Sequence, residues 1–123
     1  MAFLTDRKRA MGTGSAKTGT EHHWQMIVTS CALAILVPFF VFTFGAALGG
    51  TYEETVAYYS RPWPAIIAGL TVLVGMIHFR GGVQTLIEDY IHGTARKVAI
   101  IGAICLSYLL AAAGLLAIVR LAV

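Results

Sequence analysis

The stretch HFRGGVQTLIEDYIHG, from His78 to Gly93, ends a long apolar run and carries polar side chains into it. His78 stands where a helix embedded in lipid is expected to be apolar. Asp89 follows eleven positions later, nearly three helical turns, so it returns to the face of His78 about 16 Å along the axis. That face is small or polar throughout, and its other members are Thr71, Gly75, Gly82 and Thr85. The stripe leaves room for a flat, bulky group into which His78 would reach.

Uncharged runs on either side of this stretch predict the fold class. Met26–Leu48 and Val98–Val119 contain no charged residue, and each is long enough, at about 20 residues or more, to cross a hydrocarbon core of about 30 Å. The segment that holds His78 is predicted to be helical from about Pro64 to Tyr90, with Pro62 and Pro64 marking its start. The sequence therefore predicts an all-α integral membrane protein with transmembrane helices over about 26–48, 64–90 and 98–120. These lie in a domain of residues 26–123 that follows a polar tail of residues 1–25.

The segments outside the spans are predicted to be flexible or interfacial. The first twenty residues are polar and rich in Gly, Ser and Thr, which is typical of a loose tail. No signal-peptide pattern is present there, so the first helix is expected to remain in the mature protein. Gly49–Pro64 is predicted to be a loop whose aromatic side chains form a girdle at the membrane surface. Pro38 predicts a kink in the first span. Small residues allow close helix approach in the third span, namely Gly102, Ala103, Ser107, Ala111 and Gly114.

Composition and charge restrict the class of protein and the kinds of binding site that are expected. Of the 123 residues, 58% are hydrophobic and only 12% are charged, and the mean hydropathy is +0.76, which indicates one membrane domain. The formal net charge of +3 comes from residues that flank the spans, so no basic face is available for nucleic acid. Cys31 and Cys105 lie inside apolar spans, where the expected role is that of a small buried hydrophobe. No Cys-x-x-Cys or Cys/His cluster is present, so an iron–sulfur or zinc site within this chain is not expected.

The distribution of basic residues predicts the orientation. With three spans, the N-terminal tail and the second connection share one side of the membrane and hold Arg7, Lys8, Arg9, Lys17, Arg96 and Lys97. The other side holds Arg61 and Arg120. Because basic residues favour the inner side, this six-to-two asymmetry places the N-terminus inside and the C-terminus outside. Asp89, Tyr90 and His92 are then expected at the inner surface, and His78 deeper in the hydrocarbon.

The pattern His-x10-Asp-Tyr on a transmembrane helix, here His78, Asp89 and Tyr90 followed by Ile-His-Gly, resembles the small hydrophobic membrane-anchor subunit of succinate dehydrogenase, respiratory complex II. Mitochondrial members of that family share the Asp-Tyr-x-His-Gly ending. The first span departs from the family, because Met26 and Ile27 stand where Gln-Arg is usual, whereas Thr29 is retained.

The resemblance implies roles for these residues. His78 would be an axial ligand of the haem b iron, Tyr90 would hydrogen-bond ubiquinone, and the chain would hold no catalytic residue of its own. The second axial histidine would come from a second, larger membrane-anchor subunit, which agrees with the positions of His22, His23 and His92 at the inner surface. The other implied partners are an iron–sulfur subunit and a flavoprotein subunit. The expected function is a membrane anchor of succinate:ubiquinone oxidoreductase, inert alone, that packs with the larger anchor into a haem-containing bundle and helps form the ubiquinone-reduction site.

Each residue also has a simpler interpretation. His78 could be a neutral histidine bonded to a neighbouring helix, and Tyr90 could be an interface anchor. Asp89 is either a solvated charge or a group that orients a partner arginine or helps deliver protons. Arg80 points away from His78 and could snorkel toward headgroups or pair with a partner subunit or an anionic cofactor group. His92 is better explained as a polar loop residue than as a proton relay.

Other functions remain open from sequence. A fumarate reductase anchor would run the reaction in the other direction with a different quinone. A small transporter or channel subunit would place an acidic residue mid-membrane, whereas the acidic residues here lie outside the apolar runs. A purely structural assembly protein would lack haem. The expected location is the bacterial cytoplasmic membrane, in preference to the mitochondrial inner membrane.

Overall fold

The computed structural model describes residues 3–14 and 18–123, and within them the chain folds as helices joined by short connections. The elements are α1 (Asp6–Met11), α2 (Thr18–Ala47), α3 (Tyr52–Tyr59), α4 (Pro62–Tyr90) and α5 (Gly93–Ala122). Three segments are long and apolar enough to cross a membrane, Gly19–Ala47, Pro62–Tyr90 and Gly93–Ala122. The all-α fold with three candidate transmembrane helices is therefore confirmed.

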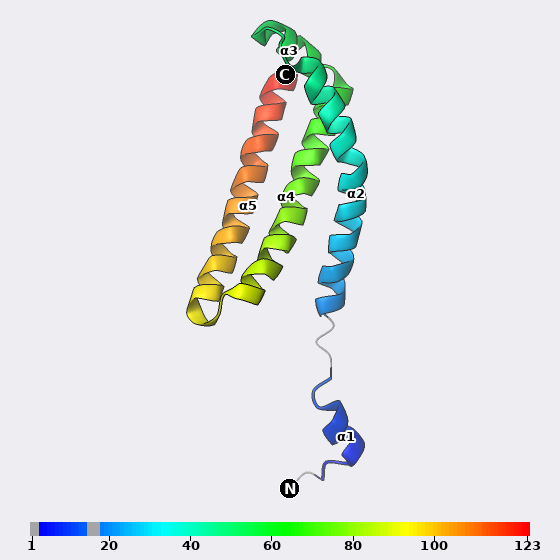
Figure 1. Cartoon of the computed structure of the whole chain (residues 1–123), viewed down its shortest axis with the longest axis vertical. Helices are drawn as coiled ribbons and strands as arrows, with labels where there is room; N and C mark the ends of the chain where they lie inside the picture. The colour runs from blue at the N-terminus through cyan, green and yellow to red at the C-terminus, as the bar shows by residue number, and fades with distance from the viewer. Residues whose placement is uncertain (1–2, 15–17) are drawn as a thin grey trace.

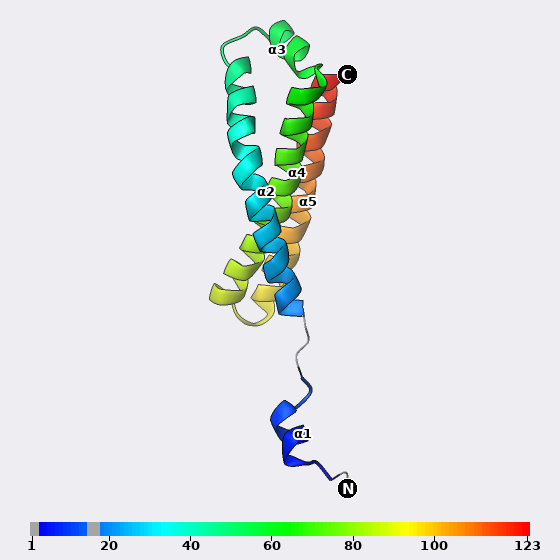
Figure 2. The same ribbon diagram turned by 90° about the vertical axis from the view of Figure 1, so that its right-hand side faces the viewer.

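Of the three long helices, α4 is the middle one, and it packs against both α2 and α5 (Figure 1). Among the described helices, α2 and α5 do not pack against each other. Figure 2 shows α2 inclined to α4, so that the two cross toward the end where the chain enters α2 and separate toward α3. The α4–α5 connection lies at the same end as the start of α2, and the C-terminus lies at the α3 end (Figures 1 and 2).

Local signals explain where α4 begins and ends. Pro62 occupies the first helical position, where a missing N–H costs nothing, and Arg61 before it is extended. After Tyr90, Ile91 and His92 are both extended. Gly93 then has a φ of +69°, a left-handed conformation that glycine adopts without a Cβ penalty. The helix therefore ends at the tyrosine that the sequence pattern singled out.

The prediction that residues 49–64 form a loop was wrong. The predicted loop 49–64 contains α3, which begins with a capping box in which Thr51 Oγ1 accepts from the Glu54 N–H and the Glu54 carboxylate accepts from the Thr51 N–H. The aromatic girdle is also incomplete, because Tyr59 is buried, although Trp63 is exposed. Burial, and then the neighbouring Tyr58, raises the pKa of Tyr59.

The polar tail is also more ordered than predicted. Its residues Asp6–Met11 form α1, capped by the Thr5 hydroxyl, which accepts from the Lys8 N–H at 3.3 Å. Lys17, counted in the charge asymmetry, lies outside the described residues. The first long helix begins at Thr18 and not at Met26, so it extends into the predicted tail. Because a helix end does not fix a membrane boundary, the division between residues 1–25 and 26–123 stays a prediction.

Small residues set the closest helix approaches. A Cβ built on Gly114 of α5 would lie 2.8 Å from Val72 Cγ1 of α4, and one on Gly81 of α4 would lie 2.5 Å from Met26 Sδ of α2. Ser107 of α5 is 2% exposed. The predicted role of small residues in α5 holds for Ser107 and Gly114 but not for Gly102, which meets nothing within 4 Å.

Candidate functional site

His78 lies on α4 and contacts α2 through a hydrogen bond. Its Nδ1 lies 2.9 Å from Oγ1 of Thr29. Thr29 is only 9% exposed, and it is the one buried residue of α2 in the described part of the chain. The contact therefore joins the two helices inside their interface, where polar groups need a partner.

The direction of this bond follows from the other contacts of Thr29. The Thr29 hydroxyl lies 2.8 Å from the Gln25 carbonyl oxygen and 3.1 Å from the Met26 carbonyl oxygen. A hydroxyl has one proton, and carbonyl oxygens only accept. The proton therefore goes to the carbonyls, and His78 Nδ1–H donates to Oγ1. In a neutral imidazole this assignment leaves Nε2 with a lone pair available to a ligand.

The stripe around His78 is only partly covered by this chain. His78, Thr71, Gly75 and Gly82 are half-buried, and Thr85 and Asp89 are exposed. A Cβ on Gly75 would meet nothing within 4 Å, and one on Gly82 would meet only Met26 Cε, at 3.9 Å. Within 4 Å of a Cβ on Gly75 the described part of this chain therefore places no atom, and the space for a flat group beside His78 stays a prediction.

Asp89, Tyr90 and His92 lie together at the α4–α5 connection. Asp89 and Tyr90 are the last two residues of α4, and His92 is the extended residue before α5. All three are exposed, Tyr90 at 80%. They lie at the same end as the start of α2, as predicted, and His78 lies about 18 Å along α4 from Tyr90. Nothing within the described residues hydrogen-bonds the Tyr90 hydroxyl, so it is available to a group from outside the chain.

Arg80 points to the other side of α4, as predicted, and has a partner that the sequence did not indicate. Its Nη1 donates to the Tyr108 hydroxyl of α5 at 2.8 Å, and its guanidinium carbon lies 5.5 Å from the ring centroid. The pair borders a cavity of about 270 Å³ that also meets Gln25 and Ser107. Within the described residues Arg80 therefore contacts an aromatic phenol and no carboxylate.

His22 is closer to the site than its sequence position indicated. A Cβ on Gly81 would lie 3.5 Å from His22 Nε2, and Gly81 is less than one turn beyond His78. That nitrogen is buried and lacks a hydrogen-bond partner in the described part of the chain. His22 shares a small cavity with Gln25, Arg80 and Gln84. The inclination of α2 to α4 brings His22 close to α4 (Figure 2). Residue spacing along one helix does not predict how two helices cross.

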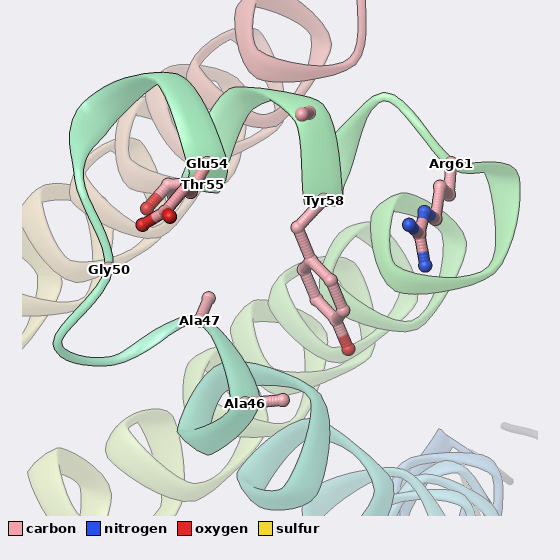
Figure 3. A pocket seen from close by; sticks show the side chains of 8 residues that line it. Ala46, Ala47, Gly50, Glu54, Thr55, Tyr58 and Arg61 are labelled. Carbon is pink, nitrogen blue, oxygen red and sulfur yellow. The ribbon is translucent and has the colours of Figure 1, made fainter.

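A larger cavity lies at the opposite end of the bundle. It encloses about 370 Å³ between the end of α2, α3 and the start of α4. Figure 3 shows Glu54 and Thr55 on one side, Tyr58 and Arg61 on the other, and Ala46 and Ala47 at the end of α2. Glu54 is already engaged in the α3 cap. The cavity is remote from His78 and adds nothing to that site.

A family model and three named relatives match this chain. The family model, described as succinate dehydrogenase/fumarate reductase transmembrane subunit, matches residues 2–116. The succinate dehydrogenase hydrophobic membrane anchor subunit of Paracoccus denitrificans is 43% identical over 121 residues, which cover 98% of this chain and 94% of that protein.

Two more distant relatives carry similar names. The succinate dehydrogenase membrane anchor subunit of Reclinomonas americana is 26% identical over 85 residues, 67% of this chain and 71% of that protein. The succinate dehydrogenase hydrophobic membrane anchor subunit of Rickettsia bellii is 29% identical over 90 residues, 72% of this chain and 71% of that protein. No solved structure matches.

Proposed function

This chain belongs to the family of succinate dehydrogenase/fumarate reductase transmembrane subunits, and on that premise we propose that, as a membrane anchor of succinate dehydrogenase, it provides a haem b ligand from His78 and a ubiquinone contact from Tyr90. The observation that carries the haem assignment is the hydrogen bond from His78 Nδ1 to Thr29 Oγ1. With Nδ1–H as the donor, Nε2 has the lone pair that can bind a metal, the arrangement that ligating histidines usually have.

The surroundings of His78 fit a haem. Gly75 and Gly82 leave the flank beside the imidazole open to a planar macrocycle. When bound, haem b supplies a one-electron redox centre whose potential depends on its axial ligands. His78 would hold the haem iron through Nε2, and Thr29 would hold the imidazole ring through Nδ1.

The second histidine for the haem would come from another chain. A second histidine from this chain would have to lie beside His78. Of the other described histidines, His22 lies beside Gly81 on the α2 side. His23 is exposed near the start of α2, and His92 lies at the helix connection. A second, larger membrane-anchor subunit that covers the open flank therefore supplies it.

Tyr90 contacts the quinone from the end of α4. Its phenol can donate to a carbonyl oxygen of ubiquinone and stabilise the negative charge that develops there during reduction. Asp89, exposed beside it, can orient a partner arginine or help deliver protons. His92 is a polar residue of the α4–α5 connection. The electrons arrive from the flavoprotein and iron–sulfur subunits, so this chain is catalytically inert alone.

The complex lies in the bacterial cytoplasmic membrane, with the N-terminus and the α4–α5 connection on the inner side. The exposed Arg96 and Lys97 on α5 and the basic residues of α1 support this orientation. Tyr90 then lies on the side where soluble electron-transfer subunits dock. The family model names both succinate dehydrogenase and fumarate reductase, so a fumarate reductase anchor is the second candidate, and the potential of the native quinone distinguishes the two.

Replacing His78 tests the haem proposal. In the purified complex, His78→Ala should weaken or shift the low-spin bis-imidazole spectrum in a reduced-minus-oxidised measurement and lower the haem stoichiometry. His92→Ala removes an exposed histidine from the α4–α5 connection and should leave both unchanged. If the spectrum and stoichiometry of His78→Ala match wild type, His78 is not the ligand. Activity need not vanish, because a water could fill the vacated coordination position.

A further inference from the structure

Thr29 makes a contact that its neighbours on α2 do not make. Hydroxyls in transmembrane helices commonly bond back to a carbonyl of the preceding turn. Ser30 does so with the Met26 carbonyl at 2.8 Å, and Ser107 does so with the Ala103 carbonyl at 2.7 Å. Thr29 makes the same back-bond to Gln25 and in addition accepts from a side chain 49 residues away. The back-bond to Gln25 already satisfies the Thr29 hydroxyl as a donor, so it does not explain why Thr29 also contacts His78.

The position of Thr29 strengthens that contact. It is buried between α2 and α4, whereas Ser30 is exposed. A hydrogen bond in low-dielectric surroundings is stronger than one in water. The Thr29 hydroxyl also donates to carbonyls while it accepts from His78, and such chains polarise each bond in turn.

We propose that Thr29 is a positioning residue that sets both the ring orientation of His78 and the reduction potential of the haem it binds. This inference rests on the proposed function. An acceptor on Nδ1–H makes the imidazole a stronger electron donor through Nε2. A stronger donor stabilises the oxidised, more positive iron. The hydroxyl of Thr29 therefore lowers the potential of the haem.

The test is a potentiometric titration of haem b in the intact complex. Thr29→Val keeps the shape of the side chain and replaces the hydroxyl by a methyl, so the potential should rise. The oxidised-to-reduced ratio at a fixed potential should change by up to about tenfold, which is about 59 mV for a one-electron couple. Thr29→Ser retains the hydroxyl and should stay near wild type. Ser30→Ala removes a back-bonded hydroxyl one residue away, without touching His78, and should also stay near wild type.

The outcomes separate this inference from the haem proposal. A raised potential in Thr29→Val that Thr29→Ser restores supports the inference, as does haem loss from Thr29→Val with full haem in Thr29→Ser and Ser30→Ala. Equal potentials in Thr29→Val, Thr29→Ser and wild type overturn it, and so does haem loss from Thr29→Ser, because packing and not the hydroxyl would then matter. If His78→Ala keeps the wild-type haem spectrum, the proposed function fails first.

Discussion

At the level of single residues, His78 and Tyr90 differ in how much of their surroundings this chain provides. His78 is half-buried and has its Nδ1 partner on α2. Tyr90 is 80% exposed at the end of α4. A hydroxyl in that position is available to a group that another molecule brings. The two residues therefore need different tests: removal of the imidazole at His78 and removal of only the hydroxyl at Tyr90.

Removing the Tyr90 hydroxyl should slow quinone reduction specifically. Tyr90→Phe keeps the ring, and an exposed ring has little packing to lose. One hydrogen bond to a developing charge contributes roughly 2–4 kcal/mol, so succinate-driven quinone reduction should fall by about one to three orders of magnitude. Tyr52→Phe, exposed at the opposite end of the bundle, is the matched control and should behave as wild type.

Two further measurements on Tyr90→Phe locate the defect. Succinate oxidation with an artificial acceptor that takes electrons upstream of the quinone should stay near wild type, and the haem spectrum should persist. Wild-type quinone reduction would make Tyr90 an interface anchor only. A parallel fall of both activities would make it a docking or assembly residue.

The sequence identified His78 because a histidine on an apolar helix is conspicuous in any fold. It also indicated the face shared with Asp89, which depends only on helical periodicity. It did not indicate the bond to Thr29, since 49 residues separate the two and their pairing depends on how α2 crosses α4. The contact between Arg80 and Tyr108 escaped prediction for the same reason. Periodicity assigns a side chain to a face, whereas the neighbour on that face depends on packing.

At the level of the helices, α4 is the element that holds the site together. It packs on both α2 and α5, and its His78 bonds to Thr29 of α2. The end of α4 was predictable from the break after Tyr90. The short helix α3 was missed although its signal, Thr51 followed three residues later by Glu54, is present in the sequence. The aromatic side chains in the same segment favoured the interpretation as a membrane-surface loop over that of a capped helix.

Filling the space at Gly114 should weaken the packing of α5 on α4. Gly114→Leu places a side chain where even a Cβ would lie 2.8 Å from Val72, and overpacking of this kind costs about 1–3 kcal/mol. The thermal midpoint of the detergent-solubilised complex should fall. Gly102→Leu on the same helix meets open space and should change it little.

A second substitution checks the cause. Val72→Ala removes the atoms that a side chain at 114 would meet, so it should recover part of the stability lost in Gly114→Leu. Equal midpoints for Gly114→Leu and Gly102→Leu would show that the α4–α5 approach is looser than the structure indicates.

Considered as a whole, the molecule has two chemically different ends. The start of α2 and the α4–α5 connection lie at one end, and α3 and the C-terminus lie at the other (Figure 1). Exposed Arg96 and Lys97 lie at the first end, and α1, which precedes α2 in the chain, contains Arg7, Lys8 and Arg9. Such asymmetry favours the first end inside.

Reporter fusions check this orientation. A reporter active only in the cytoplasm should work at the N-terminus, and a reporter active only outside should work at the C-terminus and when inserted at Gly50, in the connection before α3. A periplasm-active reporter that works at the N-terminus would reverse the topology and move Tyr90 away from the side proposed for the soluble subunits.

The two native cysteines provide sites at which the helix surfaces can be labelled chemically. Cys31 on α2 and Cys105 on α5 are free and exposed, and each lies two residues from a buried hydroxyl, Thr29 or Ser107, so both thiols point away from α4. They therefore mark the outer surfaces of two helices that do not pack against each other. Spin labels on this native pair would measure how far α2 and α5 spread, and the rate at which a lipid-soluble alkylating reagent reaches each thiol would map which surface a neighbouring subunit shields.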